Sequence, residues 1–460
     1  MNRGDTIAAI STPLGEGGIG IVRLSGPDSF RIGEKLFQPA RKPSGIYPKN
    51  RYLYHGFVKN EAGELLDEVL LSFMKAPHTF TREDVVEING HGGATVLRMI
   101  LKEVIRAGAR LAEPGEFTRR AFLNGRIDLS QAESMLKLIR ARSEKAVKIA
   151  TANVQGILSS KVEELRERAL VILAHLEARL DFPDEINEEQ DLSFIGKELV
   201  ALEKGVERLL KGAERGLIYQ EGVATAIIGK PNVGKSSLLN ALLGQKRAIV
   251  HEAPGTTRDL LEGLLVLEGF TIRLIDTAGI HGATGPVEQI GVEQSREVAG
   301  RARLLLIVFD GSSPMTKEDE VIIGLLQEDQ KAVFILNKMD LGLREEYRSL
   351  SEKYPEVPLV SISALKEEGL EELEGAITGL LGHKPALEEV EPLLVSMRHL
   401  EAVTGALEAV QRARLAWGTE PMELVSYEIR SAWGNLGEIT GDTVSDELLD
   451  YIFKEFCLGK

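Results

Sequence analysis

The 460-residue chain has one cysteine, Cys457, and no long apolar run. A single cysteine cannot form an intramolecular disulfide, which is typical of proteins in a reducing compartment. No stretch approaches the roughly 18 apolar residues needed to span a bilayer. The opening segment MNRGDTIAAIST lacks an apolar core followed by a small-residue cleavage site. We therefore expect a cytoplasmic protein that does not interact with a membrane.

Basic residues are also in deficit, with 55 Lys and Arg against 70 Asp and Glu, a net charge of −15. This balance argues against a nonspecific coat for nucleic acid, so any contact with RNA must be local. The segment from Arg119 to Lys148 is the one candidate, because its basic residues outnumber its acidic ones. It is either such a contact or the solvated face of a helix.

The pattern of apolar residues predicts several domains, since 460 residues are too many for one core. Strand-like runs dominate the first 110 residues, with one helix in GATVLRMILKEVIRAG. Helical spacing follows, then alternating strands and helices, then helical spacing again. We expect an α+β domain (1–118), a helical segment (119–216), an α/β domain (217–383) and a second helical segment (384–460). The last segment is too short for its own core, so it should pack on the first helical segment and make the α/β domain an insertion.

The string GKPNVGKSS matches a phosphate-binding P-loop, with Gly229, Gly234, Lys235 and Ser236 in register. It lies between an apolar run and a helical run, so that backbone N–H groups and a helix N-terminus can surround phosphate. Lys235 would neutralise the β- and γ-phosphates, and Ser236 would bind Mg²⁺. The predicted phosphate-binding residues are Asn232, Val233, Gly234, Lys235, Ser236 and Ser237.

Three further motifs follow in the order expected of a GTPase: PGTTRD, DTAG and NKMD. Thr257 and Asp276 can reach Mg²⁺, and the Gly279 N–H can reach the γ-phosphate. The Asp340 carboxylate can accept hydrogen bonds from N1–H and the exocyclic amine of guanine. Ser363 and Ala364 of SISAL fit a guanine loop in which the Ala364 N–H meets O6, although Leu365 replaces the usual Lys. The other predicted GTP-binding residues are Glu252, Pro254, Gly255, Thr256, Thr277, Ala278, Asn337 and Lys338.

The catalytic details differ from those of Ras-like proteins, because Ile280 occupies the position of the glutamine that orients water. Another group must then position the water. Charge can be stabilised by Arg258 or by a bound cation with Asn232 as an oxygen ligand. From the residues alone, Asn232 can equally cap or hydrate the loop.

These motifs, together with DTIAAISTPLGEGGIGIVRLSG, EINGHGG, PGEFTRRAFLNGRIDLSQAE and the terminal CLGK, resemble the tRNA modification GTPase MnmE (TrmE) family over essentially the whole chain. The resemblance implies a folate-binding-like N-terminal domain that forms a homodimer, a discontinuous all-α domain and an inserted Ras-like G domain. It also implies potassium-dependent GTP hydrolysis driven by association of two G domains.

The resemblance further implies a partner, the FAD-containing MnmG (GidA), in a heterotetramer or larger complex. Together the two proteins would add an aminomethyl or carboxymethylaminomethyl group to C5 of the wobble uridine of tRNA. The one-carbon donor would be a tetrahydrofolate derivative, either 5-formyl- or 5,10-methylenetetrahydrofolate.

Family positions also assign residues. Asn232 and the backbone oxygens of His251, Ala253 and Thr256 would bind K⁺, and Glu288 would orient the attacking water through a second water. The folate-contacting residues would be Arg23, Glu87, Arg126 and Lys460. Cys457 would be a nucleophile or a structural neighbour of the folate, whereas a surface thiol near a chain end usually has no chemistry.

Two other functions fit the GTPase motifs. The first is a ribosome-assembly GTPase that acts as a binding switch without modification chemistry. The second is a structural dimeric scaffold, which would leave the hydrolytic motifs without a purpose. The N-terminal third distinguishes them, because only the modification enzyme needs a folate site there.

Overall fold

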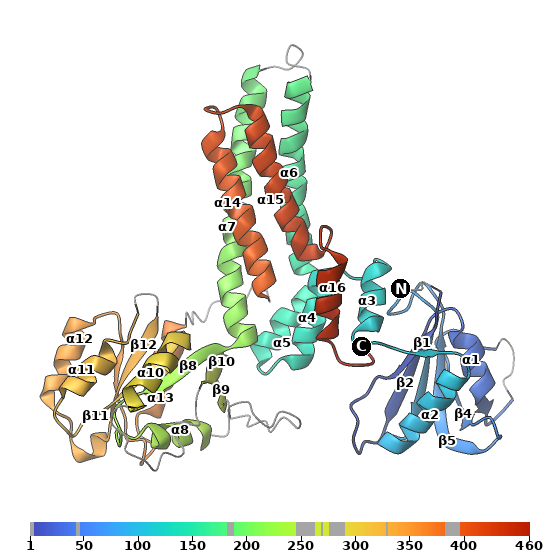
Figure 1. Ribbon diagram of the computed structural model, residues 1–460, viewed down its shortest axis with the longest axis horizontal. Coiled ribbons are helices and arrows are strands. Elements are labelled where there is room, and N and C mark those ends of the chain that lie inside the picture. The colour runs from blue at the N-terminus through green and yellow to red at the C-terminus, as the bar shows by residue number, and fades with distance from the viewer. Residues whose placement is uncertain are drawn as a thin grey trace. The chain divides into compact units, whose positions relative to one another are not determined.

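The computed structural model describes residues 4–42, 47–181, 188–244, 263–267, 270–275, 290–327, 330–381 and 396–460 (Figure 1). The chain forms two compact units. The first contains residues 1–136, 153–206 and 401–460, and the second contains residues 137–152 and 207–400. Both units are discontinuous in sequence, because the chain leaves the first unit and later returns to it.

The N-terminal part of the first unit is a seven-stranded sheet with the order β3-β4-β5-β6-β2-β1-β7. Neighbouring strands are antiparallel except β1 and β7, which are parallel. The strands are β1 (Ile7–Ile10), β2 (Gly20–Ser25), β3 (Phe37–Pro39), β4 (Leu53–Lys59), β5 (Leu65–Met74), β6 (Val85–Gly90) and β7 (Arg110–Leu111).

The two faces of this sheet are covered differently. Helices α1 (Ser29–Leu36) and α2 (Ala94–Arg106) bury one face, where Val22 and Leu97 belong to the same apolar cluster. On the opposite face, α3 (Glu116–Leu123) covers β1 through Phe117. The alternation of side chains along β4 and β5 leaves Leu53 and Leu70 exposed. Part of this second face is therefore open to solvent.

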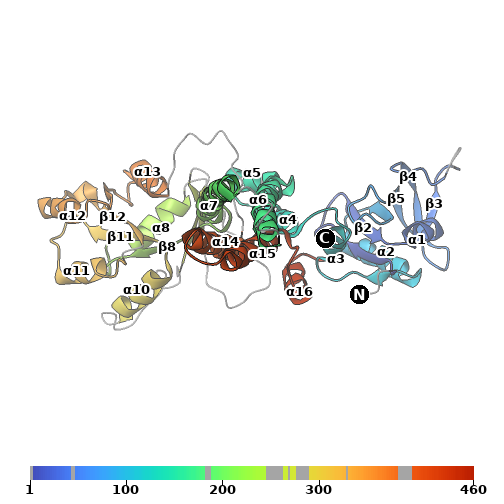
Figure 2. The ribbon, with the colours of Figure 1, turned by 90° about the horizontal axis from the view of Figure 1, so that it is seen from above.

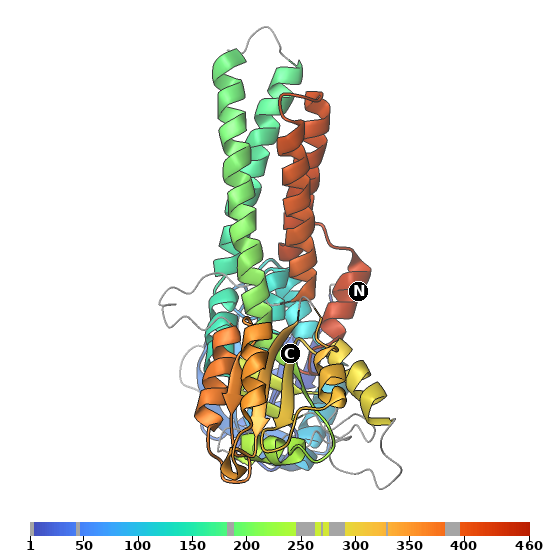
Figure 3. The ribbon, with the colours of Figure 1, turned by 90° about the vertical axis from the view of Figure 1, so that its left-hand side faces the viewer.

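The remaining part of the first unit is helical. Helices α6 (Ile157–Asp181) and α15 (Met422–Thr440) pack together through the Glu177–Arg430 ion pair, whose Oε1–Nη2 distance is 2.8 Å. Arg414 of α14 (Met397–Ala416) pairs with Glu203 of α7 (Glu188–Glu221). The four helices run side by side (Figure 3). Shorter helices of this unit are α4 (Leu129–Arg140) and α16 (Asp446–Lys454), whereas most of α5 (Glu144–Val154) belongs to the second unit. The expected packing of the tail helices on the first helical segment is confirmed.

The second unit is built on a six-stranded sheet with the order β13-β12-β11-β8-β10-β9, in which only β9 is antiparallel. Central β11 is almost wholly buried and apolar, as a strand covered on both faces must be. The strands are β8 (Val223–Ile228), β9 (Gly263–Leu267), β10 (Phe270–Leu274), β11 (Leu304–Asp310), β12 (Lys331–Asn337) and β13 (Leu359–Ser361).

Helices lie on both faces of this sheet (Figure 2). One apolar cluster joins a face of the sheet to α8 (Lys235–Gly244) and α13 (Leu370–Leu380). The other cluster joins the opposite face to α10 (Ile290–Arg301), α11 (Lys317–Ile323) and α12 (Arg348–Lys353). This arrangement confirms the expected α/β class. In open sheets of this class, ligands bind at the carboxyl ends of the strands.

Within the described ranges, no helix combines the length and the apolar character needed to cross a bilayer. The expected combination of an α+β domain, a discontinuous helical domain and an inserted α/β domain is confirmed.

A buried ion-pair network joins α3 to the strands around it. The Glu116 carboxylate, whose side chain is 1% exposed, accepts hydrogen bonds from Arg110 at 2.6 Å and from Arg120 at 3.0 Å. Arg120 also donates to Asp5 at 2.6 Å. Burial alone would raise the pKa of Glu116, but hydrogen bonds from Arg110, the Glu113 backbone N–H and Arg120 leave that pKa below its usual value.

The substitution Glu116→Gln should lower the free energy of unfolding of this domain by about 1–3 kcal/mol at pH 7, because it removes the buried negative charge that Arg110 and Arg120 share and leaves them only Asp5 and Glu83 as carboxylate partners. Since the folded-state pKa is lowered, the ionised carboxylate stabilises the fold above the ordinary carboxyl pKa of 4.5. That contribution is lost as the pH falls through the folded-state value.

Hydrogen exchange of β1 and α3 at increasing urea concentration measures this difference at pH 7 and at lower pH. The exposed Glu61→Gln serves as the control. The prediction would be contradicted if the difference in the free energy of unfolding between wild type and Glu116→Gln stayed constant as the pH fell below 4.5.

Candidate functional site

The P-loop connects the end of β8 to the start of α8 and approaches its neighbours so closely that glycine is required at two positions. A Cβ on Gly229 would collide with the carbonyl oxygen of Val308, and one on Gly234 would collide with the Asn337 side chain. Gly234 also has a φ of +98°, which favours glycine. The motif spacing read from the sequence therefore has a steric cause.

The Lys235 ammonium folds back over this loop. It donates to the carbonyl oxygens of Gly229 at 2.8 Å and Lys230 at 2.7 Å. Burial lowers the pKa of Lys235, since the charged form loses water. Within the described part of the chain it has no carboxylate partner. A partly buried cation beside a helix N-terminus is suited to bind the phosphates of a nucleotide.

Asn337, at the end of β12, brings the predicted motifs together. Its carboxamide nitrogen donates to the Val233 carbonyl at 2.8 Å, and its oxygen accepts from the Ala364 N–H at 3.0 Å. The side chain is buried, so one residue of NKMD connects the P-loop to the loop containing Ser363. The Ala364 N–H, which we expected at guanine O6, donates to Asn337 in this structure.

The remaining NKMD residues lie beside this connection. Lys338 has a φ of +65°, and its ammonium lies 2.6 Å from the Asp310 carboxylate. Burial alone would raise the pKa of Asp310, but hydrogen bonds from Lys338 and Ser312 leave it lowered. The Asp340 side chain is only 11% exposed, and the Lys366 ammonium lies 3.9 Å from it.

Sequence reasoning missed Lys366. Leu365, which takes the place of the usual Lys, is 84% exposed, and the next residue supplies the cation near Asp340 instead. The sequence did contain this lysine, because SALK places a Lys one position after the usual one.

Several predicted residues of the nucleotide site lie outside the described residues: His251, Glu252, Ala253, Pro254, Gly255, Thr256, Thr257, Asp276, Thr277, Ala278, Gly279 and Glu288. Asn232, Ser236 and Ser237 are described, and Asn232 is exposed with a φ of +64°. Its amide oxygen and the Ser236 hydroxyl are the hard oxygen donors that K⁺ and Mg²⁺ prefer. In the described ranges, no group of three or more His, Cys, Asp or Glu residues is placed to hold a metal.

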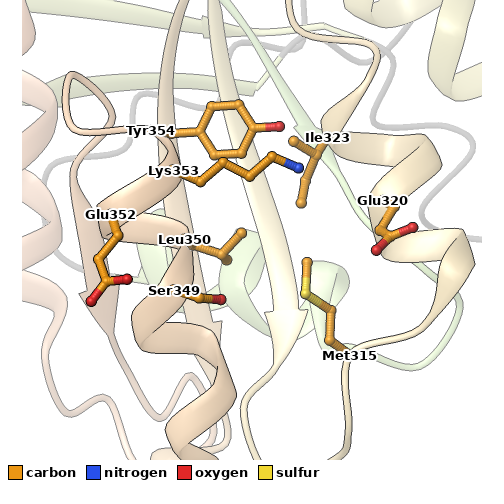
Figure 4. Close-up of a pocket in the computed structure, with 8 residues that line it drawn as sticks. All are labelled: Met315, Glu320, Ile323, Ser349, Leu350, Glu352, Lys353 and Tyr354. Atoms are coloured by element: carbon orange, nitrogen blue, oxygen red, sulfur yellow. The ribbon is translucent and has the colours of Figure 1, made fainter.

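A pocket of about 400 Å³ lies elsewhere in the second unit, between α11 and α12 (Figure 4). Met315, Ile323 and Leu350 are the apolar part of its lining, Glu320 lies at one side, and the Lys353 side chain extends toward Ile323. No predicted nucleotide-binding residue lines it.

The first unit has its own candidate site on the sheet face that α3 only partly covers. Arg23 and Glu87 are paired in register on β2 and β6, with the guanidinium 2.8 Å from the carboxylate. The Arg23 guanidinium also lies 5.9 Å from the centre of the Phe117 ring. Arg126 lies 5.1 Å from the ring of Phe80, which packs on the same apolar cluster as Phe117. Three predicted folate-contacting residues therefore surround one cluster.

The C-terminal residues bind to the same part of the sheet. The Ser11 hydroxyl donates to the Gly459 carbonyl at 3.0 Å. The Gly115 N–H, at the start of α3, approaches the Cys457 carbonyl at 3.5 Å. Ser11 follows the end of β1 and its N–H donates to the Ile21 carbonyl, two residues before Arg23 on β2. The Cys457 thiol is exposed.

Comparison with known proteins covers the whole chain. The profile of the MnmE helical domain matches residues 129–457, and the profile described as GTP-binding protein TrmE N-terminus matches residues 6–126. The chain is 44% identical to the tRNA modification GTPase MnmE of Alkaliphilus oremlandii over 99% of both chains. It is 46% identical to that of Geobacillus kaustophilus over 100% of both. The chain belongs to the MnmE family of tRNA modification GTPases.

Two solved GTPase structures are similar to part of this MnmE-family chain. The G domain of the T. maritima FeoB iron transporter is 29% identical, covering 34% of this chain and 98% of that chain with a TM-score of 0.26. Aquifex aeolicus Era bound to GDP and aluminium fluoride is 28% identical, covering 41% and 66%, with a TM-score of 0.28. TM-scores this low do not by themselves establish a shared fold.

The substitution Asp340→Asn should weaken GDP binding by about a hundredfold or more. The variant would lose the charged acceptor for the two hydrogen bonds expected from guanine, each worth about 1.5–3 kcal/mol. Fluorescence titration with labelled GDP and xanthosine diphosphate measures the effect. Xanthine presents an oxygen where guanine has its amine, so its nucleotide should bind the variant better than GDP does. Unchanged GDP affinity would show that Asp340 does not contact the base.

Proposed function

We propose that this chain is a potassium-dependent GTP hydrolase that acts in the modification of C5 of the wobble uridine of tRNA, using a tetrahydrofolate one-carbon donor and the FAD-containing partner MnmG. The observation that carries this proposal is the buried Asn337 connection between the P-loop and the guanine loop in a member of the MnmE family.

For hydrolysis, Lys235 binds the β- and γ-phosphates, and Ser236 and Thr257 bind Mg²⁺ near Asp276. Asn232 and the backbone oxygens of His251, Ala253 and Thr256 would hold K⁺, which would supply positive charge to stabilise the charge of the phosphates. Glu288 orients the attacking water. The lack of a carboxylate partner for Lys235 among the described residues supports the phosphate role.

For the one-carbon chemistry, the open sheet face is the folate site. Glu87 accepts hydrogen bonds from the pterin amide and amine, and Arg23, Arg126 and Lys460 provide cations for the glutamyl carboxylates. Cys457 lies in the tail that binds beside this face, and its exposed thiol is accessible to a tRNA base. The contact of Gly459 with Ser11 supports the participation of both chain ends.

The proposed assembly is a cytoplasmic homodimer that joins MnmG in a heterotetramer or larger complex. The exposed Leu53 and Leu70 on adjacent strands support a dimer contact through the N-terminal sheet. RNA contact through residues 119–148 has weaker support, because Arg119 pairs with Asp450 and Arg120 with Asp5.

We also propose residues 1–118, 119–216, 217–383 and 384–460 as the functional segments. The two compact units divide the chain differently, because residues 137–152, 207–216 and 384–400 belong to the second unit. Ile149 belongs to the same apolar cluster as Tyr219 and Phe270, which accounts for the place of residues 137–152.

Nucleoside analysis of tRNA from cells lacking this protein tests the proposal. A C5-modified wobble uridine should disappear and should return with the wild-type gene. Cys457→Ser should fail to restore it while GTP turnover of the purified variant stays near normal. Intact wobble uridine in the deletion strain, combined with a ribosome-assembly defect, would instead support the binding-switch function.

A further inference from the structure

A second lysine of the P-loop, Lys230, contacts the N-terminal turn of α11. Its ammonium lies 2.6 Å from the Asp319 carboxylate and donates to the Thr316 hydroxyl at 2.9 Å. The Lys230 side chain is 16% exposed and that of Asp319 is 1% exposed. The pair therefore connects the P-loop to the N-terminus of α11 in a setting largely removed from water.

Thr316 holds the Asp319 carboxylate independently of Lys230. Asp319 and Thr316 form the capping box of α11, in which the carboxylate accepts from the Thr316 N–H at 2.8 Å. The other carboxylate oxygen, Oδ1, is buried and has no hydrogen-bond partner in the described part of the chain. A buried carboxylate is costly without a countercharge, and in this structure Lys230 supplies it.

Lys230 also touches the phosphate-binding lysine. Its backbone carbonyl is one of the two acceptors that hold the Lys235 ammonium, at 2.7 Å. When Lys235 turns to phosphate oxygens, it must release the carbonyls of Gly229 and Lys230, and the loop loses two internal hydrogen bonds. The side-chain pair with Asp319 does not depend on Lys235, so it remains to hold the loop.

We propose that the Lys230–Asp319 pair is a positioning element that keeps the P-loop backbone in its phosphate-binding shape when Lys235 leaves the loop carbonyls. It thereby sets the affinity for the diphosphate of a guanine nucleotide without touching it. This inference rests on the proposed GTPase function.

Lys230→Met tests the pair, with GDP affinity as the readout. The expected loss is about tenfold or more, the typical effect of removing a partner that orients a ligand-binding group. Lys230→Arg retains a cation and should keep affinity within about threefold of wild type. Because Lys230→Met leaves a buried charge that can impair folding, the double variant Lys230→Met/Asp319→Asn is also measured. It lacks the buried charge and still lacks the connection, so it should bind GDP as weakly as the single variant.

The matched control is Arg301→Met, which breaks the exposed Glu297–Arg301 pair on α10 of the same unit and should leave GDP affinity unchanged. The preference for GDP over inosine diphosphate should be unchanged in every variant, since base recognition lies elsewhere. A double variant that binds GDP as tightly as wild type overturns this inference alone, as does loss of base preference in parallel with affinity. Failure of the wild-type chain to bind GDP overturns the proposed function and this inference with it.

Discussion

The contact between the last residues of the chain and its first strand constrains the rest of the architecture. Ser11 and Gly459 are separated by 448 positions in sequence and joined by one hydrogen bond. Gly459 lies so close to Ile10 that a Cβ would collide with the Ile10 carbonyl oxygen, and its φ is +89°. The chain must therefore return from the second unit to the sheet where it began, and it does so through α14, α15 and α16.

Each unit uses one buried or half-buried polar contact to bring distant motifs together. In the first unit the terminal residues reach Ser11 at the end of β1, in a sheet that has one face left partly open by α3. In the second unit Asn337 connects the P-loop to the loop of Ser363 and Ala364. The first contact supports the proposed folate site built from both chain ends. The second contact supports the proposed guanine-nucleotide site.

Much of this architecture could be predicted from the sequence because it depends on local spacing. The P-loop glycines are required by close approaches at Gly229 and Gly234, and a buried parallel strand such as β11 needs an unbroken apolar run. The insertion followed from a tail too short for its own core. Side-chain pairs between distant segments leave no such periodic signal. For that reason the Lys230–Asp319 pair, the Arg120 network and the position of Lys366 were not predicted, and neither was the donation of the Ala364 N–H to Asn337.

The claim that the two chain ends form one site is tested most directly with the variant Gly459→Ala. The measurement is the rise in melting temperature that 5-formyltetrahydrofolate causes. The added methyl group displaces the tail from Ile10, while Gly434→Ala, which meets nothing within 4 Å, is the control. A ligand that binds only the folded state raises its stability by RT ln(1 + [L]/Kd). The account predicts protection of wild type and control, little or none for Gly459→Ala, and unchanged GTP hydrolysis in all three. Equal protection of Gly459→Ala and wild type would contradict it.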